Sequence, residues 1–280
     1  MRRLAVAALG LLVLARVVPA VVRAAAPAPA PSAGLAPQPV APDEAEVLWD
    51  QRQEMQVERN AERARQRFTP CSTLEIPNAL IAIDGGVLDP AHSEMRWDPA
   101  KNPRQDYWPA QWAQDQDLAS ALRYSVVWYF QAVARRTGPA RMQSELQRLR
   151  YGNADISGGI DRFWLGSSLR ISAEEQVRFL RALLEGKTGF SEKAQRAVLE
   201  PLTLERGEGW RWWGKNGACR QDGTRWIGWL VGGVERPDGW AAYAVNVEGK
   251  TYAAIAERRF TATRALLESN GLLAPAAPKP

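Results

Sequence analysis

The sequence predicts an α+β domain in which helices pack on an antiparallel sheet. Three observations support this class. Apolar residues recur at helical spacing through the centre of the chain, strand-like segments separated by turns follow residue 208, and a further helix comes last. Helices followed by a meander and a closing helix are typical of α+β domains.

The first 26 residues have the composition of a secretory signal peptide. Arg2 and Arg3 precede eleven apolar residues at 4–14, and three alanines at 24–26 supply small residues for cleavage. Eleven residues are too few to cross a hydrocarbon layer of about 30 Å, although further apolar residues beyond Arg16 leave a weak anchor as the alternative. We therefore expect cleavage, export across the inner membrane and a periplasmic product without stable membrane insertion.

Most of the net charge lies in this leader. The chain carries 36 basic and 31 acidic residues, a net charge of +5. Removing the four leader arginines leaves 32 basic residues against 31 acidic ones, which is a net charge of +1. Residues 27–42 are mostly Ala and Pro and predict a flexible linker, residues 43–273 form one domain, and residues 274–280 form a disordered tail.

The counts of metal-binding residue types argue against metal chemistry. One histidine and two cysteines cannot supply a three-histidine zinc site, a four-cysteine zinc site or a four-cysteine iron–sulfur cluster. His92 lies in a turn-like stretch, which favours a solvated loop histidine over a catalytic one and disfavours a Ser-His-Asp triad. We expect no metal and no cofactor.

Taken in order, the segments are predicted as follows. Residues 43–67 are rich in Glu, Gln and Arg, which favours a helix. A buried helix face spans residues 117–136 and ends at Gly138 and Pro139, and two shorter helices are expected at 172–184 and 191–199. Ser172 and Glu175 fit a capping box that opens the first of these two.

Three strands and a last helix complete the domain. The strands are expected at 210–219, 225–235 and 240–248, and the helix at 261–269. Six of the 12 tryptophans fall between Trp210 and Trp240, interleaved with arginines. Such interleaving can mark a surface that stacks nucleic-acid bases, but burial of alternate strand residues in a core explains it better, so no nucleic-acid partner is expected.

A motif at residues 68–78, Phe-Thr-Pro-Cys-Ser-Thr-Leu-Glu-Ile-Pro-Asn, resembles the active-site stretch of class D serine β-lactamases and of the related penicillin-sensor domains. The remaining motifs follow in the family's order: Tyr124–Val127, Tyr151-Gly152-Asn153, Phe163–Leu165 before Leu169–Ser172, and Lys215–Gly217 before Ile227–Val231. The resemblance covers roughly residues 46–273. It implies a β-lactamase/transpeptidase-like fold, an antiparallel sheet flanked by helices with a largely helical insert, and two short strands within residues 43–67 in place of a helix.

The resemblance also implies a nucleophilic serine. Ser72 would attack the β-lactam carbonyl to give an acyl-enzyme that water then hydrolyses. The backbone N–H groups of Ser72 and Ala218 would form the oxyanion hole, Ser125 would relay a proton to the ring nitrogen, and Lys215 would supply positive charge beside it. Arg259, or failing that Arg258, would pair with the substrate carboxylate. The substrate-binding set implied is Val127, Trp164, Asn216, Gly217 and Arg259.

Glu75 departs from the family pattern. The family has at this position a lysine that becomes a carbamate and acts as the general base. A carboxylate keeps the charge and two acceptor oxygens, but it is shorter by about 4 Å, so we expect Glu75 to act only through a water. In the alternative, Ser72 and Glu75 form a capping box and Glu75 is purely structural. Asn216 is a second departure, since the family has Thr or Ser there.

The resemblance brings the two cysteines together. Cys71 precedes the nucleophile and Cys219 lies two residues after the Lys-x-Gly segment, a placement that resembles the bridge of certain class A carbapenemases. We predict a disulfide between them, with two buried free thiols as the alternative.

These observations predict an exported class D β-lactamase-like protein that binds β-lactams and acylates through Ser72. Its hydrolysis is expected to be weakened by Glu75. The alternatives are a sensor-like module that acylates without turnover and a non-catalytic interaction protein of the same fold. The oligomeric state is left open.

Overall fold

The computed structural model describes residues 40–274. The predicted signal peptide at 1–26, nearly all of the linker and nearly all of the tail lie outside the described residues. Among residues 40–274, no helix combines the length and the apolar character needed to cross a bilayer.

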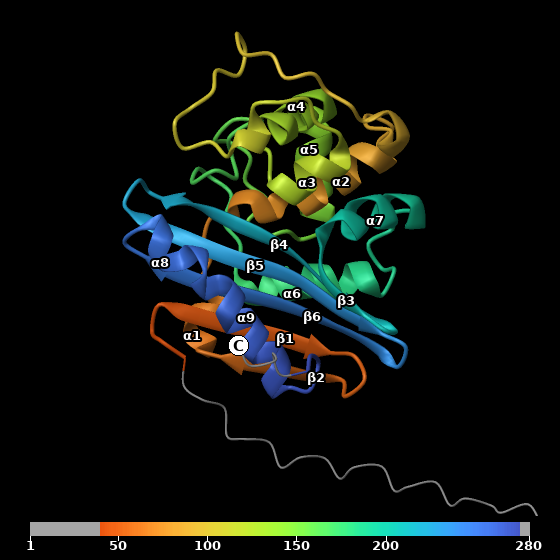
Figure 1. The fold of residues 1–280 in the computed structure, drawn as a ribbon, viewed down its shortest axis with the longest axis vertical. Coiled ribbons are helices and arrows are strands. Elements are labelled where there is room, and N and C mark those ends of the chain that lie inside the picture. The colour runs from red at the N-terminus through yellow and green to blue at the C-terminus, as the bar shows by residue number, and fades with distance from the viewer. Residues whose placement is uncertain (1–39, 275–280) are drawn as a thin grey trace, which may run out of the picture. The chain divides into compact units, whose positions relative to one another are not determined.

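The domain is built on one six-stranded antiparallel sheet (Figure 1). Its strand order is β2-β1-β6-β5-β4-β3, so β1 lies between β2 and the last strand, β6, and pairs with both. The strands are β1 (Glu44–Asp50), β2 (Met55–Arg59), β3 (Thr203–Gly207), β4 (Trp210–Gln221), β5 (Arg225–Arg236) and β6 (Gly239–Gly249).

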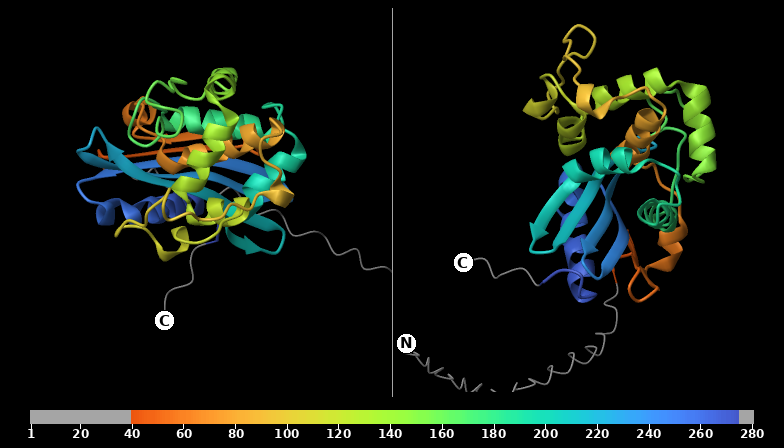
Figure 2. Two further views of the ribbon diagram at one scale, coloured as in Figure 1. Left: turned by 90° about the horizontal axis from the view of Figure 1, so that it is seen from above. Right: turned by 90° about the vertical axis from the view of Figure 1, so that its right-hand side faces the viewer.

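Helices cover both faces of this sheet, as the view from above shows (Figure 2, left). On one face α8 (Tyr252–Ala256) and α9 (Arg258–Ser269) enclose a core that includes Leu48, Tyr243 and Leu266. On the other face lie α1 (Ala61–Arg65) and α6 (Ala173–Leu184), over the larger core. A sheet with two apolar faces needs both layers, which gives the α+β architecture.

The remaining helices form the insert, which lies beyond the β3 and β4 edge in Figure 1. They are α2 (Glu75–Asp84), α3 (Leu118–Tyr124), α4 (Val127–Thr137), α5 (Pro139–Arg148) and α7 (Glu192–Leu199). All residues of α2 from Glu75 to Ile83 are buried. A helix this enclosed cannot shift without disturbing its neighbours. The side chain of Glu75, at the start of α2, is therefore held in a fixed position.

The structure confirms the class and corrects two segments. Residues 44–59 form strands rather than the helix that local composition favours, because β1 pairs on both sides, with β2 and with β6, and six of its seven residues are buried. Sheet pairing and burial here outweigh helix propensity. The family resemblance was the better guide.

The predicted helix at 117–136 is two helices. Ser125 adopts a left-handed conformation with φ of 57°, which ends α3, and α4 begins two residues later. The apolar periodicity continues across the break and therefore conceals it. The predicted capping box of Ser172 and Glu175 is confirmed, with bonds of 3.0 and 3.1 Å, whereas β3 and α5 had not been predicted.

Candidate active site

Ser72 lies in a single 3-10 turn, η1 (Cys71–Leu74), that runs directly into α2. Its side chain is largely enclosed, with 7% of the residue exposed. Cys71 enters the turn with φ of 52°, a conformation that non-glycine residues adopt at a cost and that concentrates at functional sites. The turn therefore presents Ser72 at the start of a buried helix, as the resemblance implied.

Three further polar side chains meet in front of this turn. Lys215 Nζ, on β4, donates to Ser125 Oγ at 2.8 Å, and Ser125 Oγ in turn donates to Glu75 Oε1 at 3.1 Å. Lys215 Nζ also lies 3.2 Å from Glu75 Oε2. Because Oε2 accepts no well-directed hydrogen bond within the described chain, this last contact is an ion pair rather than a hydrogen bond. The residues form a closed ring of ammonium, hydroxyl and carboxylate.

The two charged members of the ring are shut off from solvent, since Glu75 is 1% exposed and Lys215 0%, whereas Ser125 is half-buried. Burial raises the pKa of the Glu75 carboxyl above its usual value, while the Lys215 ammonium and the Ser72 hydroxyl oppose that shift. Burial likewise lowers the pKa of Lys215, and Glu75 opposes that shift. Each group keeps its charge chiefly through the other, because an isolated charge at this depth would be very costly.

Glu75 contacts two members of the cluster directly, although its side chain is short. Its carboxylate accepts from Ser125 and pairs with Lys215. Side chains three residues apart eclipse one another in a 3-10 turn, which places Glu75 on the same side as Ser72. That Glu75 acts on Ser72 through a water stays a prediction. The capping-box alternative is wrong, because Leu74 is the N-cap of α2 and no side chain caps it.

The motif strand β4, which carries Lys215–Gly217, lies against η1, the turn of the predicted nucleophile Ser72. It pairs with β3 only up to Trp213, so from Gly214 onward its only neighbour among the described strands is β5, and its other edge faces η1. A Cβ added at Gly217 would lie 2.9 Å from Pro70 O and 3.3 Å from Ser72 N. Glycine is thus required by the close approach of the two segments. Ala218 follows Gly217 on β4 and pairs with Gly228 of β5.

Asn216 helps to hold the lysine. Lys215 Nζ donates to the Asn216 backbone oxygen at 3.0 Å and lies 3.3 Å from the side-chain oxygen Oδ1. With its oxygen turned to Lys215, the amide has its nitrogen left to donate elsewhere. The second departure from the family pattern therefore keeps a donor in the site.

The structure distinguishes between the two candidate arginines. Arg258 pairs with Asp43 and Glu44, away from the serine. Arg259 is 3% exposed and donates from Nη1 to the Gly217 oxygen at 2.9 Å. Its buried Nε has no hydrogen-bond partner within residues 40–274. Arg259 is the arginine that lies at the motif strand.

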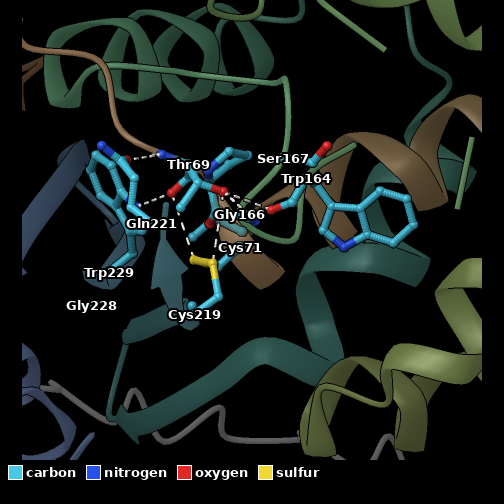
Figure 3. Close-up of a disulfide and its surroundings, with 12 residues drawn as sticks. Thr69, Cys71, Trp164, Gly166, Ser167, Cys219, Gln221, Gly228 and Trp229 are labelled. Carbon is cyan, nitrogen blue, oxygen red and sulfur yellow. Dashed lines mark hydrogen bonds between the residues drawn. A yellow bond between two sulfur atoms is a disulfide. The ribbon is translucent and has the colours of Figure 1, made fainter. Parts of the chain in front are cut away.

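A disulfide joins the nucleophile's turn to the motif strand (Figure 3). Cys71 and Cys219 are bonded across 148 residues, as predicted. Beside the bridge, Thr69 Oγ1 donates to the Trp164 oxygen and accepts from the Gly166 N–H, both at 2.9 Å. The bridge and Thr69 tie three distant segments together at the base of the site.

Trp164 takes part in these hydrogen bonds through its backbone carbonyl. Its carbonyl accepts from both Thr69 and the Cys71 N–H, and its ring packs edge-on against Phe163 at 4.9 Å. In Figure 3 the indole points away from the disulfide. Within the described residues its N–H makes no hydrogen bond to Glu75.

The Tyr-Gly-Asn motif is structural support. Gly152 has φ of 58°, and a Cβ there would lie 2.0 Å from the Arg170 oxygen. Asn153 bonds the Ser168 oxygen at 3.0 Å and the Arg170 N–H at 2.9 Å, which pins one loop to another. Tyr151 is buried beneath the nucleophile's turn and does not line the site surface. Val127 is half-buried at the first turn of α4.

Other residues singled out in the sequence lie elsewhere. His92 is 84% exposed and contacts Asp89, so it is the loop histidine expected. The tryptophans of β4 and β5 pack inward, with Trp213 and Trp229 fully buried. No group of three or more potential metal ligands occurs in the part of the chain that the structure describes. Thr69 and Gln176 were missed. Thr69 lies within the motif at 68–78 but was given no role there, Gln176 belongs to none of the motifs, and only the tertiary contacts show what the two side chains bind.

A buried serine at a helix start, a second serine on a helix break and a lysine on the facing strand define the class of penicillin-interactive serine proteins. The chain matches the family model of the penicillin binding protein transpeptidase domain over residues 43–266, and it belongs to that family. Its relatives there include β-lactamases and a regulatory protein, BlaR1 of Bacillus licheniformis. β-Lactamase OXA-48 of Klebsiella pneumoniae is 40% identical over 205 residues, 73% of this chain and 75% of that protein.

Solved structures agree with this assignment. A class D β-lactamase from Nostoc superposes with a TM-score of 0.76 at 32% identity, covering 82% of this chain and 94% of that one. The C-terminal domain of the Bacillus licheniformis BlaR penicillin-receptor superposes with a TM-score of 0.75 at 30% identity, covering 82% and 92%. Enzymes and a receptor domain are thus both similar to this chain.

Proposed function

We propose that the protein is an exported, β-lactam-binding serine hydrolase whose turnover is slow. The observation that carries this proposal is the convergence of Ser72, Glu75, Ser125 and Lys215 in one buried, hydrogen-bonded cluster. Nucleophile, base and proton relay need mutual reach. Lys215, Ser125 and Glu75 lie 2.8–3.2 Å from one another, and Ser72 lies in the turn that leads into Glu75. Export rests on the leader composition and localisation would be periplasmic.

In the proposed reaction, Glu75 takes the hydroxyl proton of Ser72 as Oγ bonds to the β-lactam carbonyl carbon. The N–H groups of Ser72 and Ala218 stabilise the oxyanion. The ring C–N bond then breaks, and the nitrogen receives a proton from Ser125, which is replenished from the Glu75 and Lys215 side of the ring. Water, with Glu75 again as base, hydrolyses the ester, releasing the opened β-lactam and free Ser72.

The ion pair is the reason for expecting slow turnover. To act as a base Glu75 must give up part of its interaction with Lys215, and a buried carboxylate already paired is a weaker acceptor than a free one. Its short side chain is also held between Ser125 and Lys215, which leaves little freedom to orient an attacking water. We expect acylation to survive better than deacylation.

A sensor-like module is the second candidate, favoured by the similarity to the BlaR penicillin-receptor domain. Such a protein would stop at the acyl-enzyme. A further alternative is an interaction protein that keeps the fold but does not react with β-lactams.

The deciding experiment incubates the purified chain with a fluorescent penicillin and with a chromogenic cephalosporin, beside Ser72→Ala and Glu75→Lys. Labelling with slow turnover, both abolished in Ser72→Ala, is the expected result. Labelling without turnover would favour the sensor, and a wild type that is never labelled would refute the proposal. Activity gained in Glu75→Lys alone would identify a decayed enzyme.

The pH dependence of acylation gives a further prediction. Glu75 must be ionised to accept a proton, and burial raises its pKa above the ordinary 4.5, so the acid limb of the rate should lie above pH 4.5. Lys215 must stay protonated to hold Ser125, and burial lowers its pKa below 10.5, so the alkaline limb should lie below pH 10.5. Labelling rates measured from pH 4 to 11 check the bell shape, and a rate still rising past pH 10.5 would contradict it.

The two neighbouring arginines offer a matched test of carboxylate binding. We expect Arg259→Ala to lower kcat/KM for acylation about ten- to hundredfold, since hydrogen bonds to charged groups contribute roughly 1.5–3 kcal/mol. Arg258→Ala removes the same charge one residue away, where Arg258 pairs with Asp43, and should leave kcat/KM within about twofold. Equal losses in both variants would argue against carboxylate recognition by Arg259.

A further inference from the structure

A buried chain of hydrogen bonds runs from the Tyr-Gly-Asn motif to the turn that carries Ser72. The Tyr151 hydroxyl donates to Gln176 Oε1 at 3.2 Å, and Gln176 Nε2 donates to Thr73 Oγ1 at 2.8 Å. Thr73 Oγ1 then donates to the Pro70 oxygen at 2.9 Å. Tyr151, Gln176 and Thr73 are each at most 1% exposed, so water cannot substitute for a lost partner.

The hydrogen bonds of this chain all run in one direction, from donor to acceptor, from Tyr151 towards Pro70. Because the Thr73 hydroxyl gives its only hydrogen to Pro70, it can only accept from Gln176. This requirement orients the Gln176 amide, so that its oxygen faces Tyr151 and accepts from the phenol. A side chain at position 176 must therefore supply one acceptor and one donor at fixed places. Burial raises the pKa of Tyr151, which keeps its proton in place.

This chain of hydrogen bonds ends at the Pro70 oxygen, beside the turn that carries Ser72. The Pro70 oxygen also accepts the Thr73 N–H at 3.2 Å, so it receives two bonds from the residue after Ser72. The same oxygen is the atom nearest to Gly217 on the motif strand, and Ser72 N is close by. A shift of Thr73 would thus move the Ser72 amide relative to Ala218, the other oxyanion donor.

Gln176 is well placed to fix the position of Thr73. It lies on α6, whose start is fixed by the Ser172 and Glu175 capping box and which packs on β1 and β6. The Gln176 side chain thereby links the turn that carries Ser72 to a helix that packs on the sheet. The disulfide fixes the same turn from its other end, at Cys71.

We propose that Gln176 is a positioning residue for acylation, which sets the Ser72 hydroxyl and amide through Thr73. The inference rests on the proposed function, since acylation by Ser72 is the step it serves. Gln176 acts through Thr73, to which it donates, and not through a hydrogen bond of its own to Ser72 among the described residues. A displacement of about 1 Å at a reacting group can cost on the order of 100-fold in rate, so its loss should be visible in acylation.

The test compares Gln176→Met with Gln176→Glu. Methionine fills similar space without donor or acceptor, and we expect acylation about 10- to 100-fold slower at every pH. A protonated glutamic acid has the same shape as glutamine, with one acceptor and one O–H donor. We therefore expect Gln176→Glu to be slow at neutral pH and to approach the wild-type rate as the pH falls. Rates are taken as ratios to wild type at each pH, which cancels the titration of Glu75 and Lys215.

The neighbouring charges do not imitate this signature. Glu175 is paired with Arg67 at 2.6 Å and is present in all the variants, as is Tyr151. Ratios that stay flat with pH in both variants, or a Gln176→Met rate equal to wild type, would overturn the proposal. Tyr151→Phe removes only the first donor of the hydrogen-bond chain, and we expect it to slow acylation by less than Gln176→Met does. This variant tests the proposal if a variant at position 176 does not fold.

Hydrogen exchange separates this inference from the proposed function. If the wild type is never labelled, the proposed function fails, and the positioning role is decided by the backbone of residues 70–75 alone. Faster exchange there in Gln176→Met, with α6 unchanged, supports the role. Unchanged exchange in residues 70–75 overturns it.

Discussion

Glu75→Gln is expected to lower the acylation rate of Ser72 by about 10²–10⁴-fold and to destabilise the fold by about 3–5 kcal/mol. The amide keeps the shape of the carboxylate but cannot take a proton from Ser72. It also leaves Lys215, which is fully buried, without a counter-charge. Single-turnover labelling with a fluorescent penicillin and urea unfolding measure the two effects.

The double variant Glu75→Gln with Lys215→Met separates charge from chemistry. Removing both members of a buried pair is often neutral for stability, whereas removing one is not. We therefore expect the double variant to regain most of the stability lost in Glu75→Gln while its acylation stays as slow or slower. A double variant less stable than Glu75→Gln would show that the ion pair itself is not the source of the loss.

Carbon dioxide should have no effect on this site. In the family pattern the base is a lysine carbamate, but here a carboxylate already contacts Ser125 and Lys215. We expect equal labelling rates in degassed buffer and in buffer with added bicarbonate at the same pH. The Glu75→Lys variant is the matched control, because it restores the family's lysine; a wild-type rate that rises with bicarbonate would contradict the assignment of Glu75 as base.

Loss of the disulfide is the second large effect. Replacing both Cys71 and Cys219 by serine should lower the free energy of unfolding by up to about 5 kcal/mol, because the bridge closes a span of 148 residues in the unfolded chain. Urea unfolding of the variant, compared with the oxidised and the reduced wild type, measures the loss. Reduced wild type and variant should agree.

The bridge also bears on the site, so activity should fall with it. Cys71 adjoins Ser72 and Cys219 lies on the strand of Lys215, so their link holds the turn of Ser72 against that strand. We expect slower acylation in the serine variant even under conditions where it remains folded. Wild-type acylation in a folded variant would restrict the disulfide to stability.

Local sequence predicted the regular elements where one force dominates. The capping box at Ser172 and the strands of the meander depend on neighbours close in sequence, and they are as expected. Residues 44–59 did not follow local propensity, because their conformation is decided by pairing with β6, nearly 200 residues away. The break at Ser125 was also hidden, since hydrophobic spacing reports a buried face and not the dihedral angle of one residue on it.

For the site, the sequence by itself determined which residue types are present and in which order: a serine before a buried helix, a second serine, a lysine strand and two cysteines suitably placed for a bridge. The counts of His and Cys also argued against the common metal sites, and the turn-like setting of the single histidine disfavoured a Ser-His-Asp triad. Only the tertiary structure decided that Glu75 reaches Ser125 and Lys215 directly, that Arg259 rather than Arg258 lies at Gly217, and that Gln176 joins the nucleophile's turn to the sheet. The physical reason is that hydrogen bonds and ion pairs act over a few ångströms, and distances of that size between residues far apart in the chain are set by how the layers pack.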